Sequence, residues 1–180
     1  IEIIEDKEEN QKNGDSWKII VADDDIEVHR VTRLVLKEFK FEGRGLNVLS
    51  AYSETEVKEL VRKNPDTNVI FLDVIMDKDD SGLNVVRYIR DELKNRTIRI
   101  ILRTGQPGQA PEEETIVNYD INDYKEKTEL TTKKLFTSLI TALRTYSHIT
   151  ELEQSQKGLK EIITSTSEIF KPHVSDDFYK

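Results

Sequence analysis

Acidic side chains follow two apolar runs of this chain, and they are the residues best suited to chemistry. Asp23 and Asp24 come directly after residues 17–22, and Asp73 lies near the end of residues 69–76. Apolar, largely β-branched runs without alternation are typical of strands buried on both faces of a parallel sheet. An ionised carboxylate is costly to bury without a partner, so we expect Asp73 at the carboxyl end of its strand, at the mouth of a pocket.

Carboxylates that converge at neighbouring strand ends repel one another, and a divalent cation removes the conflict. Mg²⁺ prefers oxygen ligands, usually one or two carboxylates completed by water and phosphate oxygens. We therefore predict Asp24 and Asp73 as direct ligands, and Asp23 as a direct or water-mediated ligand. The backbone carbonyl of Ile75 can supply a further oxygen. The cation would neutralise charge on a phosphoryl group while Asp73 attacks it and forms an aspartyl phosphate.

Two further residues are placed to hold phosphoryl oxygens at the same edge of the sheet. Thr104 follows the predicted strand 98–103 and offers a hydroxyl, and the neighbouring Gly105 leaves room for a close approach. Lys127 ends the predicted strand 123–127, and its ammonium can act as a point-charge clamp for phosphate. Acids, a hydroxyl and a cation are thus expected in one place.

The strands that must position these residues alternate with helices. Apolar runs predict strands over 17–22, 46–52, 69–76, 98–103 and 123–127. Short loops between such units imply an α/β fold with a parallel sheet covered on both faces. Five units favour a flavodoxin-like, doubly wound sheet of order 2-1-3-4-5, in which the strand order reverses beyond strands one and three. Asp23, Asp24 and Asp73 lie at the carboxyl ends of those two strands.

Helical spacing of apolar residues predicts the intervening helices. The first helix spans 26–39, the second runs from Ser53 or Glu54 to about Lys63, and a short helix covers about 111–118. The helix after Gly82 is expected to carry one apolar face made of Leu83, Val86, Ile89 and Leu93. His29, His148 and His173 have no ligand spacing among them, and we expect them at the surface.

The ends of the chain have a different character from its centre. Residues 1–15 are highly charged apart from three isoleucines and read as a mobile lead-in, followed by one domain over 16–147. From Glu129 the pattern predicts an extended C-terminal helix. Its apolar stripe narrows to a coiled-coil spacing at Ile149, Leu152, Gln156, Leu159, Ile163 and Phe170. We read 148–180 as a signalling helix or linker toward a missing downstream domain, which either pairs with its copy or packs on that domain.

Bulk composition excludes several classes of protein. The 180 residues carry a formal charge of −8, with no basic stripe of the kind that binds nucleic acid. No apolar run approaches the length of a membrane span. The chain has no cysteine, which excludes disulfides and thiolate metal sites and favours a reducing, cytoplasmic location.

Four motifs, in order, resemble those of two-component response regulator receiver domains, over roughly residues 17–147. They are Val21-Ala22-Asp23-Asp24-Asp25, Phe71-Leu72-Asp73-Val74, Leu102-Arg103-Thr104-Gly105 and Asp123-Tyr124-Lys125-Glu126-Lys127. The resemblance implies that Asp73 takes a phosphoryl group from a histidine kinase or a phosphotransfer protein, with Mg²⁺ as cofactor bound by Asp23, Asp24 and Asp73. It also implies a signalling module rather than an enzyme. Lys127 matches the lysine of the family better than Lys125 does, counting from Tyr124.

The same resemblance implies a switch, in which Thr104 and Tyr124 move together on phosphorylation. Residues 103–111 and the long tail resemble a subgroup whose receiver precedes a GAF-like domain and sometimes an HD-GYP cyclic-dinucleotide phosphodiesterase, an output that would lie outside this chain. Thr128 departs from the family, which usually has proline there after a cis peptide. A cis bond before a non-proline residue costs roughly 3–4 kcal/mol, so we expect a trans bond at Lys127–Thr128.

Other interpretations of the same residues remain open. Any one of the three aspartates could be a solvated strand end or helix cap, and Tyr124 could serve packing alone. A phosphatase of the haloacid dehalogenase type also uses a strand-end aspartate as nucleophile, but it places a second Asp two residues later, where this chain has Ile75. A nucleotide-binding flavodoxin-like enzyme is disfavoured because no glycine-rich loop follows the first strand.

Overall fold

A computed structural model describes residues 16–105, 113–127 and 131–169, and its centre is one parallel sheet. The order of its five strands is β2-β1-β3-β4-β5. This confirms the predicted flavodoxin-like, doubly wound fold. The strands are β1 (Ser16–Ala22), β2 (Gly45–Ala51), β3 (Val69–Asp73), β4 (Arg99–Thr104) and β5 (Asp123–Glu126).

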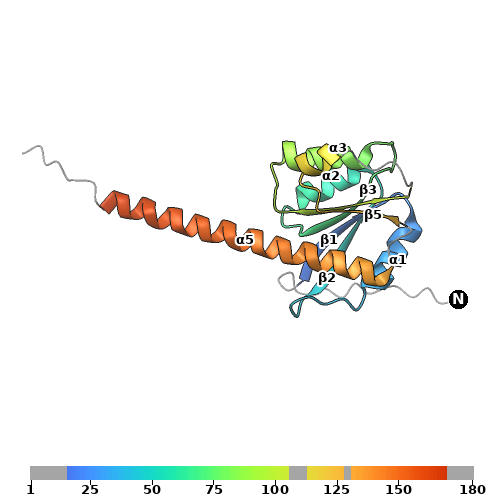
Figure 1. Ribbon diagram of the computed structural model, residues 1–180, viewed down its shortest axis with the longest axis horizontal. Helices are drawn as coiled ribbons and strands as arrows, with labels where there is room; N and C mark the ends of the chain where they lie inside the picture. The colour runs from blue at the N-terminus through green and yellow to red at the C-terminus, as the bar shows by residue number, and fades with distance from the viewer. Residues whose placement is uncertain (1–15, 106–112, 128–130, 170–180) are drawn as a thin grey trace, which may run out of the picture.

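Helices cover both faces of the sheet (Figure 1). One face packs against α1 (Ile26–Leu36) and α5 (Thr132–Ile169). The other packs against α2 (Glu54–Lys63), α3 (Ser81–Arg87), the π-helix η1 (Tyr88–Glu92) and α4 (Glu113–Asn118). Successive side chains of a strand point to opposite faces, so each central strand contributes to both cores. In β1, for example, Ile19 and Val21 join the α1/α5 core, and Ile20 and Ala22 join the other.

Strand register brings the functional strand ends together. Ala22 of β1 lies opposite Leu72 of β3, and Asp73 lies opposite Arg103 of β4. β3 ends at Asp73, three residues before the apolar run does. The chain turns there because Val74 donates its N–H to the Arg103 carbonyl and accepts from the Gly82 N–H at 3.0 Å. These two hydrogen bonds fix the backbone directly after Asp73, and so help to fix the position of its carboxylate.

The first helix forms as predicted but turns another face to the core. Asp25 caps α1 by accepting from the Glu27 N–H at 2.8 Å. The buried residues of this helix are His29, Thr32 and Leu36, whereas the apolar Val31 and Leu34 are exposed. The predicted surface position of His29 is therefore wrong. Its ring is buried because Nε2–H donates to the Asp23 carbonyl at 2.8 Å and Nδ1 lies 3.0 Å from Ser50 Oγ.

A π-helical turn changes the face of the helix that follows Gly82. In η1 the Leu93 N–H donates to the Tyr88 carbonyl, five residues back. The wider turn leaves Leu93 exposed, against the predicted apolar stripe, and brings Arg90 to full burial. The Arg90 guanidinium donates to four backbone carbonyls, those of Asn95, Ile98, Tyr119 and Asp120. Burial lowers the pKa of Arg90 to about 10, so it stays charged at neutral pH and joins η1 to the chain segment before β5.

The last helix confirms the predicted C-terminal extension. Its first part packs on the sheet through Leu135, Leu139 and Leu143, and its second part projects well beyond the domain (Figure 1). Among the described residues, no helix has both the length and the apolar character to cross a bilayer. The predicted lead-in over 1–15, the Lys127–Thr128 bond and Phe170 lie outside the described residues.

Candidate functional site

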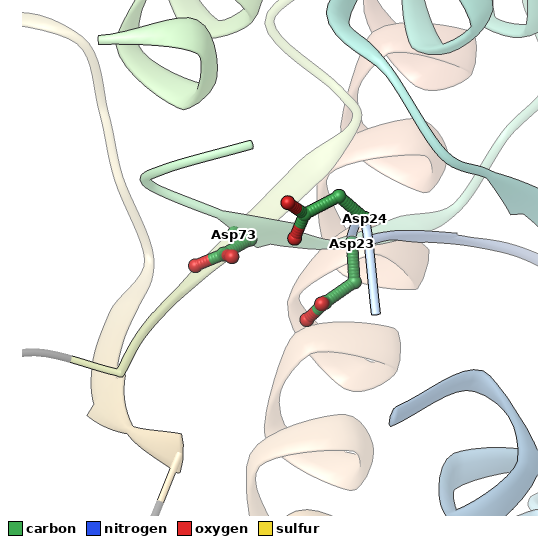
Figure 2. A group of neighbouring side chains, drawn as sticks. All are labelled: Asp23, Asp24 and Asp73. Atoms are coloured by element: carbon green, nitrogen blue, oxygen red, sulfur yellow. The ribbon is translucent and has the colours of Figure 1, made fainter. Parts of the chain in front are cut away.

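Three carboxylates gather at the carboxyl ends of β1 and β3. An oxygen from each of Asp23, Asp24 and Asp73 lies within 4.8 Å of the other two (Figure 2). Asp23 and Asp73 are buried, and Asp24 is exposed. Figure 2 shows Asp23 and Asp24 on one chain segment and Asp73 beside them on β3. Such a group of oxygen donors, with one side open to solvent, is of the kind that Mg²⁺ prefers.

Lys127 supplies the cation nearest to these acids. Its Nζ lies 2.8 Å from Asp73 Oδ2 and 3.0 Å from Asp23 Oδ2. Lys125, two residues earlier, points elsewhere and pairs with Asp123 at 3.1 Å. Burial alone would lower the pKa of Lys127, but its hydrogen bonds to Asp73 and Asp23 outweigh burial and raise that pKa. The ammonium therefore stays charged between the two carboxylates.

The two oxygens of Asp73 have different surroundings. Oδ2 accepts from Lys127, whereas Oδ1 is buried with no hydrogen-bond partner among the described residues. Burial raises the pKa of Asp73, with a contribution from the negative charge of Asp23, and Lys127 and, more weakly, the Ile75 N–H only partly oppose it. A buried carboxylate oxygen without a donor is costly unless water or a cation satisfies it. The residues present thus fit the Mg²⁺ predicted from the sequence.

The other predicted residues lie at the same edge of the sheet. Thr104 is buried at the end of β4, one residue beyond the position opposite Asp73. A side chain added at Gly105 would place its Cβ 3.8 Å from Lys127 Cδ, so this position has room for a methyl group as well. Tyr124 is half-buried against the core on the α2–α4 side. Ile75 follows in the loop after β3, with a half-buried side chain.

Sequence reasoning missed two residues that touch Asp23. His29 donates to its carbonyl, as described above. Arg103, 1% exposed, places Nη2 3.4 Å from Asp23 Oδ2. The signal for Arg103 was present, because an arginine inside an apolar strand needs a buried partner. Asp77, in the loop after β3, is exposed, and its carboxylate accepts from the Glu54 N–H at 3.2 Å and from Ser81 Oγ, which lowers its pKa.

The doubly wound parallel sheet carries an acid cluster and a lysine where its strand order reverses. The model of the response regulator receiver domain matches residues 19–140. The chain therefore belongs to the response regulator receiver family, and it contains the regulatory receiver domain of a two-component response regulator. This membership decides against the phosphatase and the nucleotide-binding enzyme considered above. A second model, described as a domain of unknown function (DUF3369), matches residues 139–180.

Known proteins agree with this assignment. A curated relative, the 3'3'-cGAMP-specific phosphodiesterase 2 of Vibrio cholerae serotype O1, is 44% identical over 153 residues, which are 85% of this chain and 29% of the relative. The chain thus spans less than a third of that protein.

Solved structures of low sequence identity share the fold. A response regulator receiver domain protein from Clostridium thermocellum has a TM-score of 0.63 at 22% identity, over 74% of this chain and 98% of that chain. The signal receiver domain of an HD domain-containing protein from Pseudomonas fluorescens Pf-5 has a TM-score of 0.65 at 16% identity, over 78% and 96%.

The turn that follows Asp73 depends on the absence of a side chain at Gly82. A Cβ there would lie 2.3 Å from the Asp73 carbonyl oxygen and 2.8 Å from Val74 Cα, both backbone atoms that cannot turn aside. We expect Gly82→Ala to lower the free energy of unfolding by about 2 kcal/mol, as overpacking of a rigid site does. Gly105→Ala is the matched control and should change it by less than about 1 kcal/mol. Urea denaturation measures both, and equal effects would contradict the close approach.

Proposed function

We propose that Asp73 accepts a phosphoryl group from the phosphohistidine of a histidine kinase or phosphotransfer protein, in a Mg²⁺-dependent reaction. The observation that carries the proposal is the buried carboxylate of Asp73, with Lys127 Nζ 2.8 Å from one oxygen and no hydrogen-bond donor among the described residues at the other. Receiver domains as a family bind Mg²⁺ at an acidic pocket and are phosphorylated by such donors. Asp23, Asp24 and Asp73, with the Ile75 carbonyl, are the residues that would hold the ion here.

The proposed step is a simple displacement. A carboxylate oxygen of Asp73 attacks the phosphorus of the phosphohistidine, the O–P bond forms as the P–N bond breaks, and the departing imidazole keeps the electron pair and takes a proton from water. Lys127 is placed to hold a phosphoryl oxygen by its charge, and the Thr104 hydroxyl to hold another. Bound Mg²⁺ would supply further charge neutralisation. Asp73 must be ionised to attack, so its raised pKa favours reaction at neutral rather than acidic pH.

Phosphorylation would then act through a shift of conformational population. Contacts of Thr104 with the new phosphoryl group would favour one state, and Tyr124 on the adjacent strand would follow. β4 and β5 pair directly, with Leu102 opposite Tyr124 and Thr104 opposite Glu126, which supports coupling between the two positions. The surface around α4 and α5 would change with them.

The output lies in a downstream module that α5 would reach. The similarity to a 3'3'-cGAMP-specific phosphodiesterase supports a module that hydrolyses a cyclic dinucleotide in the cytoplasm. Residues 148–180 would be the signalling helix or linker between receiver and output.

The proposed phosphoacceptor is tested with a small phosphodonor. Acetyl phosphate and Mg²⁺ should add one phosphoryl group to the wild-type chain, read as one mass increment of the intact protein. Asp73→Asn removes the nucleophile and should show none, and a chelator added to wild type should suppress labelling by at least about tenfold. Equal labelling of wild type and Asp73→Asn would rule out Asp73 as the acceptor.

We further propose that the projecting part of α5 pairs with a second copy. Leu152, Leu159 and Ile163 are 60%, 59% and 60% exposed and keep the spacing of a coiled-coil seam. Leu159→Glu should weaken self-association by more than about tenfold in sedimentation, because it places a charge in that seam. Leu34→Glu, at an exposed leucine of α1, should not. A wild-type chain that stays monomeric with and without beryllofluoride would favour packing of the stripe on the following domain instead.

A further inference from the structure

Arg103 brings a second, fully buried cation to the acid cluster. It lies on β4 opposite Asp73, and its side chain points to the α1/α5 face of the sheet. Nη2 lies 3.4 Å from Asp23 Oδ2, Nη1 lies 3.3 Å from Thr32 Oγ1 of α1, and the guanidinium lies 5.6 Å from the centre of the Phe71 ring. Nε has no hydrogen-bond partner among the described residues. A guanidinium keeps its charge even when buried, so the carboxylate beside it has to compensate for its lost hydration.

Donors of its own chain already occupy both oxygens of Asp23. Lys127 donates to it, Arg103 donates to it, and the Asp25 N–H lies 3.1 Å from Oδ1. A cation that binds this buried carboxylate therefore competes with these donors for its lone pairs. The Arg103 contact is the longest of them, and Thr32 offers this side chain a second partner. Arg103 is thus the donor that a bound cation would displace from Asp23 most easily.

The net charge of the site also indicates that Arg103 opposes the binding of a divalent cation. Three carboxylates face two cations, Lys127 and Arg103, so the site has one net negative charge. With Lys127 alone it would have two, which a divalent ion would balance. The buried Arg103 makes the site less attractive to a divalent ion until an anionic phosphoryl group joins it.

From this geometry we propose that Arg103 is the resident counter-ion of Asp23. It holds the Asp23 carboxylate in the metal-free site, is displaced from it when Mg²⁺ binds, and so weakens Mg²⁺ binding. Arg103 is a positioning residue, since it acts through Asp23. The inference rests on the proposed Mg²⁺ site.

Titration calorimetry with MgCl₂ tests the inference directly. Arg103→Met keeps an unbranched apolar stem and removes the charge, and it should bind Mg²⁺ about tenfold more tightly than wild type. Arg103→Lys keeps the charge and should stay within about threefold of wild type. Arg99→Met is the matched control, since Arg99 is as buried on the same strand but pairs with Asp120 at 3.0 Å. It should lower stability and leave Mg²⁺ affinity unchanged.

The outcomes separate this inference from the proposed function. If wild type binds Mg²⁺ and Arg103→Met binds it equally or more weakly, the counter-ion role is wrong and the phosphoacceptor site stands. A loosened pocket would also give weaker binding, so a gain in affinity cannot come from damage. If wild type binds no Mg²⁺ and is not labelled by acetyl phosphate, both proposals fall.

A measurement on the unmodified chain covers the case in which Arg103→Met does not fold. The Arg103 Nε–H should give a distinct ¹⁵N resonance because it is buried. We expect this resonance to move on addition of MgCl₂ and to saturate with the same dissociation constant as calorimetry gives. A resonance that stays in place while Mg²⁺ binds would overturn the proposal.

Discussion

The ammonium of Lys127 lies between two buried carboxylates, and the site depends on this contact. Asp23 is 0% exposed and Asp73 is 3% exposed, and two ionised carboxylates at such burial repel each other and lose their hydration. Lys127 Nζ is 3.0 Å from the first and 2.8 Å from the second. It joins the ends of β1 and β3 to the end of β5, which β4 separates from β3 in the sheet. The same charge can later hold a phosphoryl group, so one residue stabilises the resting site and prepares the reaction.

The fold and the central acids could be predicted from the sequence because their signals are local. An uninterrupted apolar run with one carboxylate, as around Asp73, describes a buried strand and its end without knowledge of its neighbours. Alternation of such runs with helical spacing then determines the parallel sheet and the edge at which strand ends meet. Lys127 follows from the same rule, since it comes directly after β5.

The residues that were missed have polar partners outside their own helix or strand. Arg103 pairs with Asp23, 80 positions earlier, and the buried His29 donates to the Asp23 carbonyl just beyond β1. A helical stripe cannot reveal such a bond, which is why α1 was expected to bury its apolar residues. Leu93 was misplaced for another reason, because the π-turn of η1 shifts the buried face of the helix to Arg90, which donates to carbonyls outside the helix. Hydrophobic periodicity predicts which face a regular helix buries. Buried polar contacts can turn a different face of that helix toward the core.

In this receiver domain two cations, Lys127 and Arg103, lie beside the acid cluster. Lys127 alone would leave one more negative charge uncompensated. Its site faces one edge of the sheet, and α5 leads away from the domain (Figure 1). On the α1/α5 face, Phe71 of β3 and Ile101 of β4 share one core with this helix, so α5 packs against the strand that carries Asp73.

The chemistry at Asp73 is the claim on which the rest depends. Borohydride reduction of the chain after treatment with acetyl phosphate and Mg²⁺ converts an aspartyl phosphate to homoserine, and peptide mass mapping locates it. We predict homoserine at position 73 and at no other aspartate. Homoserine at Asp23 or Asp24, or none at all in a chain that carries the phosphoryl mass, would contradict the account.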